Sequence, residues 1–246
     1  MRLVAIVPAF NEAPSLAAVV RRLRAYVPGC DVCVVDDGSA DETAAVAEGL
    51  GAIVLRSPVN LGIGGAVQTG YLFAREHGYD AAVQVDADGQ HDPAYVLDAL
   101  RPIEEGRANI VVGSRFLTRG GYRSTFLRRT GIRYLSWFLA ARCGVRVTDP
   151  TSGFRVVDRA GIALFARTYP SDYPEPESLA VATRAGLRVV EVPVLMQERA
   201  HGASTINAVR TAYYFVKVSL ALLLLPDRER PVAALSSAAD DGGRPR

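Results

Sequence analysis

The chain has 246 residues, of which 28 are Lys or Arg and 26 are Asp or Glu, so its net charge is only +2. This length suits one sizeable α/β domain with a tail, and the near-neutral charge argues against a nucleic-acid-binding protein. The basic charge is uneven, because residues 106–148 contain nine Arg and no acidic residue.

Short apolar, β-branched runs alternate with helical patterns through the first half of the chain. The runs predict strands at Leu3–Val7, Val32–Val35, Ala52–Leu55, Ala81–Val85 and Ile110–Val112. The stretches between them predict helices at Pro14–Tyr26, Asp41–Leu50, Gly64–His77 and Pro93–Glu105. This alternation is typical of βαβ units, so we expect a Rossmann-like α/β fold with a mostly parallel sheet flanked by helices.

The second half of the chain has a different pattern of predicted elements. Residues 126–144 have helical spacing with aromatic and arginine side chains, and residues 173–186 enter a helix through a proline-rich turn. A strand at Arg188–Leu195 and an apolar helix at Ile206–Leu225 follow. We therefore expect a catalytic domain at 1–205, a C-terminal helix at 206–225 and a disordered tail at 226–246.

The C-terminal helix is too short to cross a bilayer. Its longest charge-free apolar piece, Val218–Leu225, has eight residues, whereas a span takes about 20. The helix is either a core or homo-oligomer element, or one that lies on a membrane or binds a small membrane protein. Three cysteines and an N-terminus that enters a strand at once predict a cytoplasmic protein, peripheral at the inner face of the plasma membrane.

Cys30 and Cys33 form a C-x-x-C pattern within a run that reads as a buried strand. Alternation along a strand places their side chains on opposite faces, which suits neither a disulfide nor a zinc site. We interpret both as structural.

Acidic residues follow the first two predicted strands. Glu12 comes after the first, and Asp36 and Asp37 come after the second. The carboxyl ends of parallel strands are where open α/β sheets bind ligands, so these carboxylates are candidates for binding the base and ribose of a nucleotide. The alternative is that Asp37 begins a turn and Asp41 caps a helix.

The run VQVDADGQHDP, at residues 83–93, gives the strongest indication of a functional site. The strand Ala81–Val85 delivers Asp86 and Asp88 two residues apart, with Gln90 and His91 nearby. Hard divalent cations prefer such oxygen ligands together with phosphate oxygens. The pattern predicts Mg²⁺ or Mn²⁺ bound beside a nucleotide diphosphate.

Arg115 follows the fifth predicted strand, and a guanidinium matches phosphate oxygens well. The alternative interpretation is that Arg115 forms a salt bridge at the protein surface. Arg128, Arg129 and Arg133 can bind an acceptor phosphate or simply attract anionic headgroups.

Seven motifs occur in order over residues 2–205: P-A-F-N-E, D-D-G-S-x-D, N-L-G, D-A-D-G-Q-H-D-P, G-S-R, D-P-T-S-G-F-R and E-R-x-x-G-x-S. In these motifs the chain resembles the inverting family 2 glycosyltransferases of the GT-A fold, in particular the polyprenol-phosphate sugar synthases. The resemblance implies a nucleotide pocket lined by Pro8, Phe10, Glu12 and Asp37, and a metal held by Asp86, Asp88 and Gln90. It also implies that the acceptor phosphate or donor diphosphate meets Arg115, Arg199 and Ser204, with Asp88, Arg115 and Arg199 catalytic.

The implied reaction is inverting transfer of a sugar from a GDP- or UDP-linked donor to a polyprenyl phosphate. A phosphate acceptor is already largely dianionic at neutral pH and needs positioning more than a base. If the acceptor is instead a hydroxyl of a glycan or small molecule, Asp149, Glu175 and Glu177 are candidate bases.

The sequence argues against two other classes of protein. A sugar-phosphate nucleotidyltransferase would need an N-terminal glycine-rich loop with a basic residue, which the sequence lacks. A non-catalytic subunit of a membrane partner has no reason to keep Asp86, Asp88, Arg115 and Arg199 together. The central expectation is spatial: Glu12, Asp37, Asp86 and Asp88 surround one cleft with Arg115 at its mouth.

Overall fold

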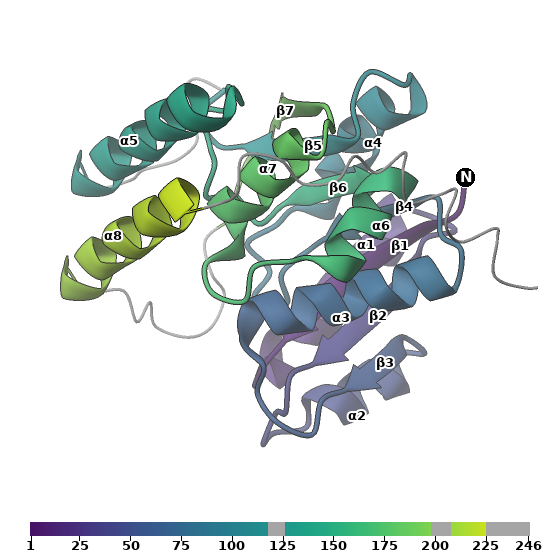
Figure 1. Ribbon diagram of the computed structural model, residues 1–246. Helices are drawn as coiled ribbons and strands as arrows, with labels where there is room; N and C mark the ends of the chain where they lie inside the picture. Colours follow the sequence, from purple (N-terminus) through teal and green to yellow (C-terminus); the bar gives the residue numbers. More distant parts are fainter. Residues whose placement is uncertain (118–125, 198–207, 225–246) are drawn as a thin grey trace, which may run out of the picture.

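The structure is a computed structural model that describes residues 1–117, 126–197 and 208–224. It contains a seven-stranded sheet with helices on both faces (Figure 1). The strands are β1 Leu3–Ala9, β2 Asp31–Asp36, β3 Ile53–Arg56, β4 Ala81–Gln84, β5 Ile110–Ser114, β6 Arg155–Asp158 and β7 Val189–Pro193. The helices are α1 Ala13–Tyr26, α2 Thr43–Gly49, α3 Gly62–Glu76, the 3₁₀ turn η1 Pro93–Tyr95, α4 Val96–Glu104, α5 Phe126–Cys143, α6 Arg159–Arg167, α7 Pro174–Arg184 and α8 Ala208–Leu224.

The sheet is mostly parallel, as predicted. Its strand order is β3-β2-β1-β4-β6-β5-β7. β6 is antiparallel to both of its neighbours, and the other strand pairs are parallel. Because β4 and β5 both run opposite to β6, they point the same way as β1 and β2. All these strands therefore present their carboxyl ends at one edge of the sheet.

β6 and α6 are elements for which the sequence pattern gave no prediction. β6 has only four residues, and its Arg155 is fully buried. The guanidinium is satisfied by donating to the carbonyls of Ser152, Pro150 and Glu175 and to the hydroxyl of Ser178. A buried strand can hold an arginine here because these oxygens replace water.

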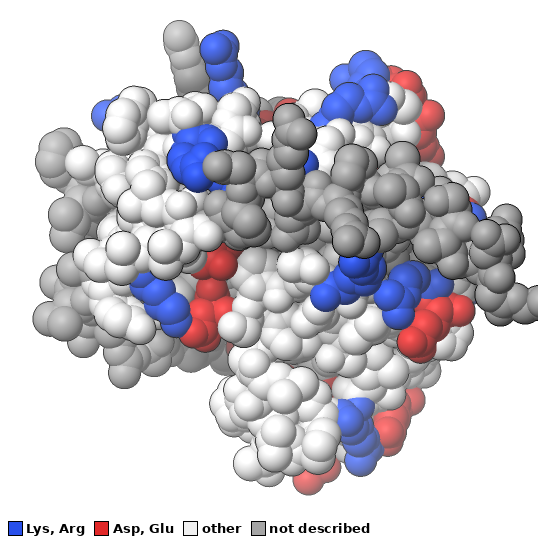
Figure 2. All heavy atoms as spheres, viewed as in Figure 1, with Lys and Arg blue, Asp and Glu red and all other residues white. Residues whose placement is uncertain are grey.

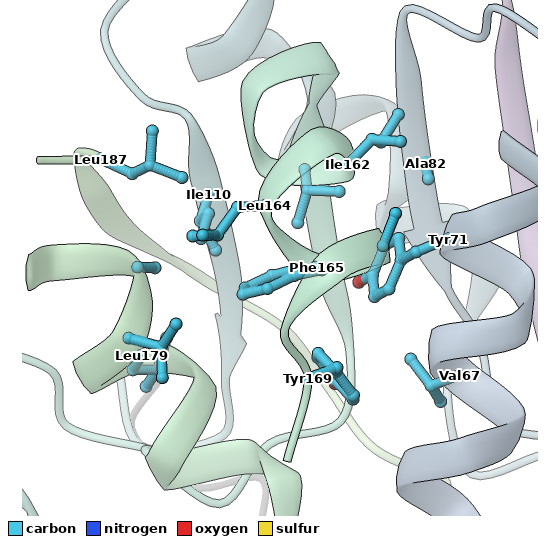
Figure 3. Packing of buried hydrophobic residues seen from close by; sticks show 14 of the residues in the cluster. Val67, Tyr71, Ala82, Ile110, Ile162, Leu164, Phe165, Tyr169, Leu179 and Leu187 are labelled. Atoms are coloured by element: carbon cyan, nitrogen blue, oxygen red, sulfur yellow. The ribbon is translucent and has the colours of Figure 1, made fainter. Parts of the chain in front are cut away.

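Two hydrophobic cores cover the two faces of the sheet. On one face, α3, α6 and α7 pack around an aromatic group in which Phe165 lies 5.3 Å from Tyr71 and 5.1 Å from Tyr169 between ring centroids (Figure 3). On the other face, α1, α2 and α4 contribute apolar side chains such as Leu16 and Val96. With both faces covered, the strands are buried on both sides, as expected for a parallel sheet.

The two cysteines of the C-x-x-C pattern pack on opposite sides of β2, as predicted. Cys33 belongs to the core under α3, whereas Cys30 packs against the core under α1. Both thiols are free, and burial raises the pKa of each to about 12. A thiol with so high a pKa is a poor nucleophile at neutral pH.

Helix α8 confirms the predicted C-terminal helix and packs against α5 and α7. Figure 1 shows α5 and α8 side by side at one end of the molecule. Val218 and Leu222 of α8 are buried, and Tyr214 meets Tyr173 edge-to-face at 4.7 Å between ring centroids. The domain boundaries at 205 and 225 stay predictions, and the predicted tail at 226–246 lies outside the described residues.

Candidate active site

A pocket of about 270 Å³ opens at the carboxyl edge of the sheet. Its lining comes from the ends of β1, β2 and β4 and the start of α3: Pro8, Ala9, Phe10, Glu12, Asp37, Asn60, Gly62, Ile63, Ala66, Asp86, Ala87 and Asp88. Glu12, Asp37, Asp86 and Asp88 all belong to this lining, so the structure brings together the acids expected to share one cleft.

Phe10 and Glu12 form one side of the pocket, in the turn between β1 and α1. Phe10 is 47% exposed, which leaves its ring accessible to a flat ligand such as a base. The Glu12 carboxylate accepts a hydrogen bond from the Ser15 hydroxyl at 2.6 Å, and its backbone N–H donates to Thr43 Oγ1 at 2.9 Å. The turn is therefore fixed before any ligand binds.

Asp36 and Asp37 have different surroundings, although they are adjacent. Asp36 accepts the Ser39 N–H at 3.1 Å and is not part of the pocket lining, so its role in nucleotide binding stays a prediction. Asp37 accepts the backbone N–H groups of Leu61 and Gly62 at 2.8 and 2.9 Å. It thereby fixes the start of α3, and its oxygens keep further acceptor capacity toward the pocket.

Asp86 and Asp88 supply two carboxylates to one pocket. The Asp86 side chain is 34% exposed, whereas Asp88 is buried and accepts the Gln90 N–H at 2.9 Å. Among the described residues, no group of three or more His, Cys, Asp or Glu could hold a metal ion. Since Mg²⁺ is commonly held by one or two carboxylates plus substrate phosphates, this pair fits a cation shared with a bound diphosphate.

Gln90 takes part in the turn through its backbone. Its N–H donates to Asp88, and its carbonyl accepts the Gln197 N–H at 2.9 Å. Its side chain is not part of the pocket lining, so a role for its amide oxygen as a ligand stays a prediction.

The position of Arg115 corrects the prediction that it lies at the mouth of the cleft. It follows β5 as expected, but it is buried and outside the pocket lining. Its Nε and Nη2 donate to the two carboxylate oxygens of Asp149, both at 2.6 Å, and Nη2 also donates to the Thr151 hydroxyl at 2.8 Å. The sequence analysis singled out both residues but not their pairing, because Asp149 lies 34 residues further along the chain.

The candidate bases also differ in their surroundings. Asp149 is fully buried and paired with Arg115, so both of its oxygens are engaged. Burial raises the pKa of Glu175, against the opposing effect of Arg155. Burial likewise raises the pKa of Glu177 to about 6, against the opposing effect of Lys217.

Two of the predicted phosphate-binding residues, Arg199 and Ser204, lie outside the described residues. The segment just before them is anchored to the Asp86–Asp92 turn. Gln197 donates its side-chain amide to Asp92 at 3.0 Å and accepts from Arg22 at 2.9 Å.

The sheet topology and the pocket at its carboxyl edge define an α/β protein with a candidate ligand site at that edge. Residues 4–162 match the family described as Glycosyl transferase family 2, which covers more than half of the chain. The chain belongs to this family.

Among characterised relatives, the chain is similar to the undecaprenyl-phosphate mannosyltransferase of Micrococcus luteus. The two are 33% identical over 219 residues, which cover 84% of this chain and 88% of that protein. The polyprenol monophosphomannose synthase of Mycolicibacterium smegmatis is 30% identical over 220 residues, which cover 84% and 81% of the two chains.

The fold is also similar to a solved structure of glucosyl-3-phosphoglycerate synthase from Mycobacterium tuberculosis, in complex with Mn²⁺, UDP and glucosyl-3-phosphoglycerate. The TM-score is 0.67 at 21% identity, covering 91% of this chain and 78% of that one. At this identity the likeness shows the GT-A fold alone.

Proposed function

We propose that the protein transfers a sugar from a GDP- or UDP-linked donor to a polyprenyl phosphate at a membrane surface, with inversion at the anomeric carbon. The observation that carries this proposal is the single pocket that gathers Phe10, Glu12, Asp37, Asp86 and Asp88. Two relatives that cover most of the chain are named for transfer of mannose to polyprenyl phosphates, which supports the same acceptor class here.

Different residues of the pocket would bind different parts of the sugar donor. Phe10 offers a ring face to the base, and Glu12 and Asp37 offer oxygens to base or ribose donors. Asp86 and Asp88 would hold Mg²⁺ or Mn²⁺, which neutralises charge on a departing nucleoside diphosphate. Gln90 is the further ligand implied by the family resemblance. Arg199 and Ser204 are proposed to orient the acceptor phosphate, and Arg115 to support that side of the site from its buried pair with Asp149.

No general base is required for this acceptor. A phosphate monoester is largely dianionic at neutral pH and can attack the anomeric carbon once it is held opposite the leaving group. The pairing of Asp149 with Arg115 agrees with this, because that carboxylate is engaged.

We further propose that α5 and α8 lie on the membrane. Trp137 is 64% exposed, and Tyr213, Leu220 and Leu224 are also exposed on these helices, beside the basic Arg129 and Arg133. Figure 2 shows uncharged surface at this end of the molecule, together with both basic and acidic side chains. In the described part of the chain, no helix is both long and apolar enough to cross a membrane. Aromatic, leucine and arginine side chains together suit the interface of an anionic bilayer.

The reaction is tested with purified protein, labelled GDP-mannose, UDP-glucose or UDP-N-acetylglucosamine, and Mn²⁺. Each donor is offered with a polyprenyl phosphate and, separately, with the corresponding polyprenol. We expect a lipid-linked product from the phosphate alone, with the anomeric configuration opposite to that of the donor. Transfer to the polyprenol, or no transfer to the phosphate from any donor, would contradict the proposal.

A further inference from the structure

A small cluster of buried side chains lies directly behind Asp86. It consists of Gln84 from β4, His91 from the turn after Asp88, and Gly153 from the loop before β6. Gln84 and His91 are each 2% exposed. Neither side chain has a role in the donor binding described above, although both face the same carboxylate.

His91 has a defined tautomer. Its Nδ1 accepts the backbone N–H of Asp86 at 3.0 Å. A backbone N–H can only donate, so Nδ1 carries no proton and the neutral ring is protonated on Nε2. This Nε2 is buried, has no hydrogen-bond partner among the described residues and lies 3.7 Å from Asp86 Oδ2. At 3.7 Å this is a close approach of the ring nitrogen to the carboxylate charge and not a hydrogen bond.

The other oxygen of Asp86 has a donor of its own. Gln84 Nε2 donates to Asp86 Oδ1 at 3.2 Å. Oδ1 thus accepts a hydrogen bond from Gln84, and Oδ2 has the buried His91 Nε2 at 3.7 Å. A carboxylate held in this way has fewer orientations than a free one, which reduces the entropy lost when it binds a cation.

Gly153 provides the space for this arrangement. A Cβ at this position would lie 3.2 Å from His91 Cε1 and 3.3 Å from both Asp86 Oδ2 and Gln84 Nε2. Its φ is not positive, so the reason for glycine is close approach rather than an unusual backbone conformation. Phe154 completes the packing, edge-to-face with His91 at 5.6 Å between ring centroids.

We propose that His91 is a positioning residue of the active site: its Nδ1 fixes the backbone at Asp86, and its Nε2–H orients the Asp86 carboxylate toward the divalent cation. The inference rests on the proposed function, because it takes Asp86 to be a metal ligand. Outer partners of metal ligands typically change metal affinity or activity by about 10–100-fold when removed.

Two variants separate the roles of the ring nitrogens. His91→Asn keeps an acceptor near the position of Nδ1 and removes the Nε2–H donor. His91→Gln keeps an amide donor at about the reach of Nε2. Mn²⁺ affinity is measured by calorimetry and electron paramagnetic resonance in the presence of UDP or GDP, with the thermal midpoint of unfolding measured on the same samples. Leu23→Ala, in the core under α1 and outside the pocket lining, is the control for a general loss of stability.

We expect His91→Asn to weaken Mn²⁺ binding about 10-fold or more, His91→Gln to weaken it less than His91→Asn does, and Leu23→Ala to leave it unchanged despite a lower unfolding midpoint. Gly153→Ala is a second, independent variant, and it should weaken Mn²⁺ binding in the same direction because its Cβ displaces the same side chains. Wild-type Mn²⁺ affinity in His91→Asn, or a loss no greater than that in Leu23→Ala, would overturn the role of His91 while sugar transfer by the wild-type protein still stands. If the wild-type protein neither binds Mn²⁺ with a nucleoside diphosphate nor transfers sugar, the proposed function falls as well.

Discussion

Arg115 and Asp149 form an ion pair with both side chains buried, at 4% and 0% exposed. Removing one partner of such a pair leaves an uncompensated charge in the interior. We therefore expect Arg115→Gln to lower the free energy of unfolding by about 3–5 kcal/mol, measured by urea denaturation. A surface arginine would cost far less.

The double variant Arg115→Gln with Asp149→Asn is the control for this prediction. It removes both charges, so it should recover part of the stability that Arg115→Gln loses. If the single variant is as stable as the wild type but loses transfer activity, Arg115 acts on the phosphate rather than in the fold.

Asp88 is the acid of the D-x-D pattern that lies deepest, and it accepts the Gln90 N–H. Asp88→Asn keeps an acceptor for that N–H and removes the charge, so the fold should survive. We expect sugar transfer to fall by more than the roughly 10–100-fold typical for loss of an outer partner of a metal site. EDTA should abolish wild-type transfer, and unchanged turnover in EDTA would refute the metal requirement.

At the scale of elements, the start of α3 packs closely against the backbone of residues 170–171. A Cβ at Gly64 would lie 2.2 Å from the Pro170 carbonyl oxygen and 2.3 Å from that of Ser171. Gly64→Ala should therefore destabilise the protein and disturb the pocket, to which neighbouring Gly62 and Ile63 contribute. Calorimetric unfolding midpoints and donor affinity measure the two effects.

Gly49 in α2 offers a matched comparison. It is also helical, and a Cβ there meets nothing within 4 Å. Gly49→Ala should raise stability by roughly 0.5–1 kcal/mol, since alanine loses less backbone entropy in a helix than glycine. Equal effects of the two substitutions would show that the contact between Gly64 and residues 170–171 is unimportant.

Glu177 in α7 links stability to pH. Burial raises its pKa from 4.5 to about 6, so the folded state binds more protons than the unfolded state between these values. Stability from this group is thus present at low pH and lost as pH rises through about 6. Relative to wild type, Glu177→Gln should gain little in unfolding temperature at pH 4.5 and more at pH 7. A gain that is constant across this range would contradict the shift.

The elements differ in how far the sequence predicts them. The strands β1 to β5 and the helices between them follow a regular alternation of apolar runs and helical patterns, and their predicted bounds agree with the structure to within a few residues. β6 has four residues, begins with an arginine and ends with an aspartate, so only its two central valines match the pattern of a buried strand. Its position between β4 and β5 depends on hydrogen bonds to distant carbonyls.

The residues of the candidate active site also differ in how far the sequence predicts their positions. Glu12, Asp37, Asp86 and Asp88 follow strands directly, so the rule for parallel strands places them together. The partners of Arg115 and Asp86 could not be predicted in this way. Asp149 and Gly153 come from the loop before β6, which does not follow a parallel strand, so the same rule does not place them.

At the scale of the whole molecule, the end that carries α5 and α8 is expected to bind anionic vesicles. Replacing the exposed Trp137 and Leu220 together by serine should reduce flotation with such vesicles, because both contribute apolar area to that surface. Leu97→Ser, on α4 across the sheet and also half exposed, is the matched control and should float like the wild type. Equal flotation of all three proteins would place the membrane contact elsewhere.

The antiparallel strand β6 also constrains the order in which the protein can assemble. Strands β1 to β4 form a continuous parallel unit early in the chain. The edge of β4 that faces away from β1 pairs with residues 155–158 of β6. During synthesis on the ribosome, the nascent chain therefore exposes an open sheet edge next to Asp86 until β6 has emerged. A truncated chain that stops after residue 117 would carry every acidic motif of the pocket and still be prone to edge-to-edge aggregation.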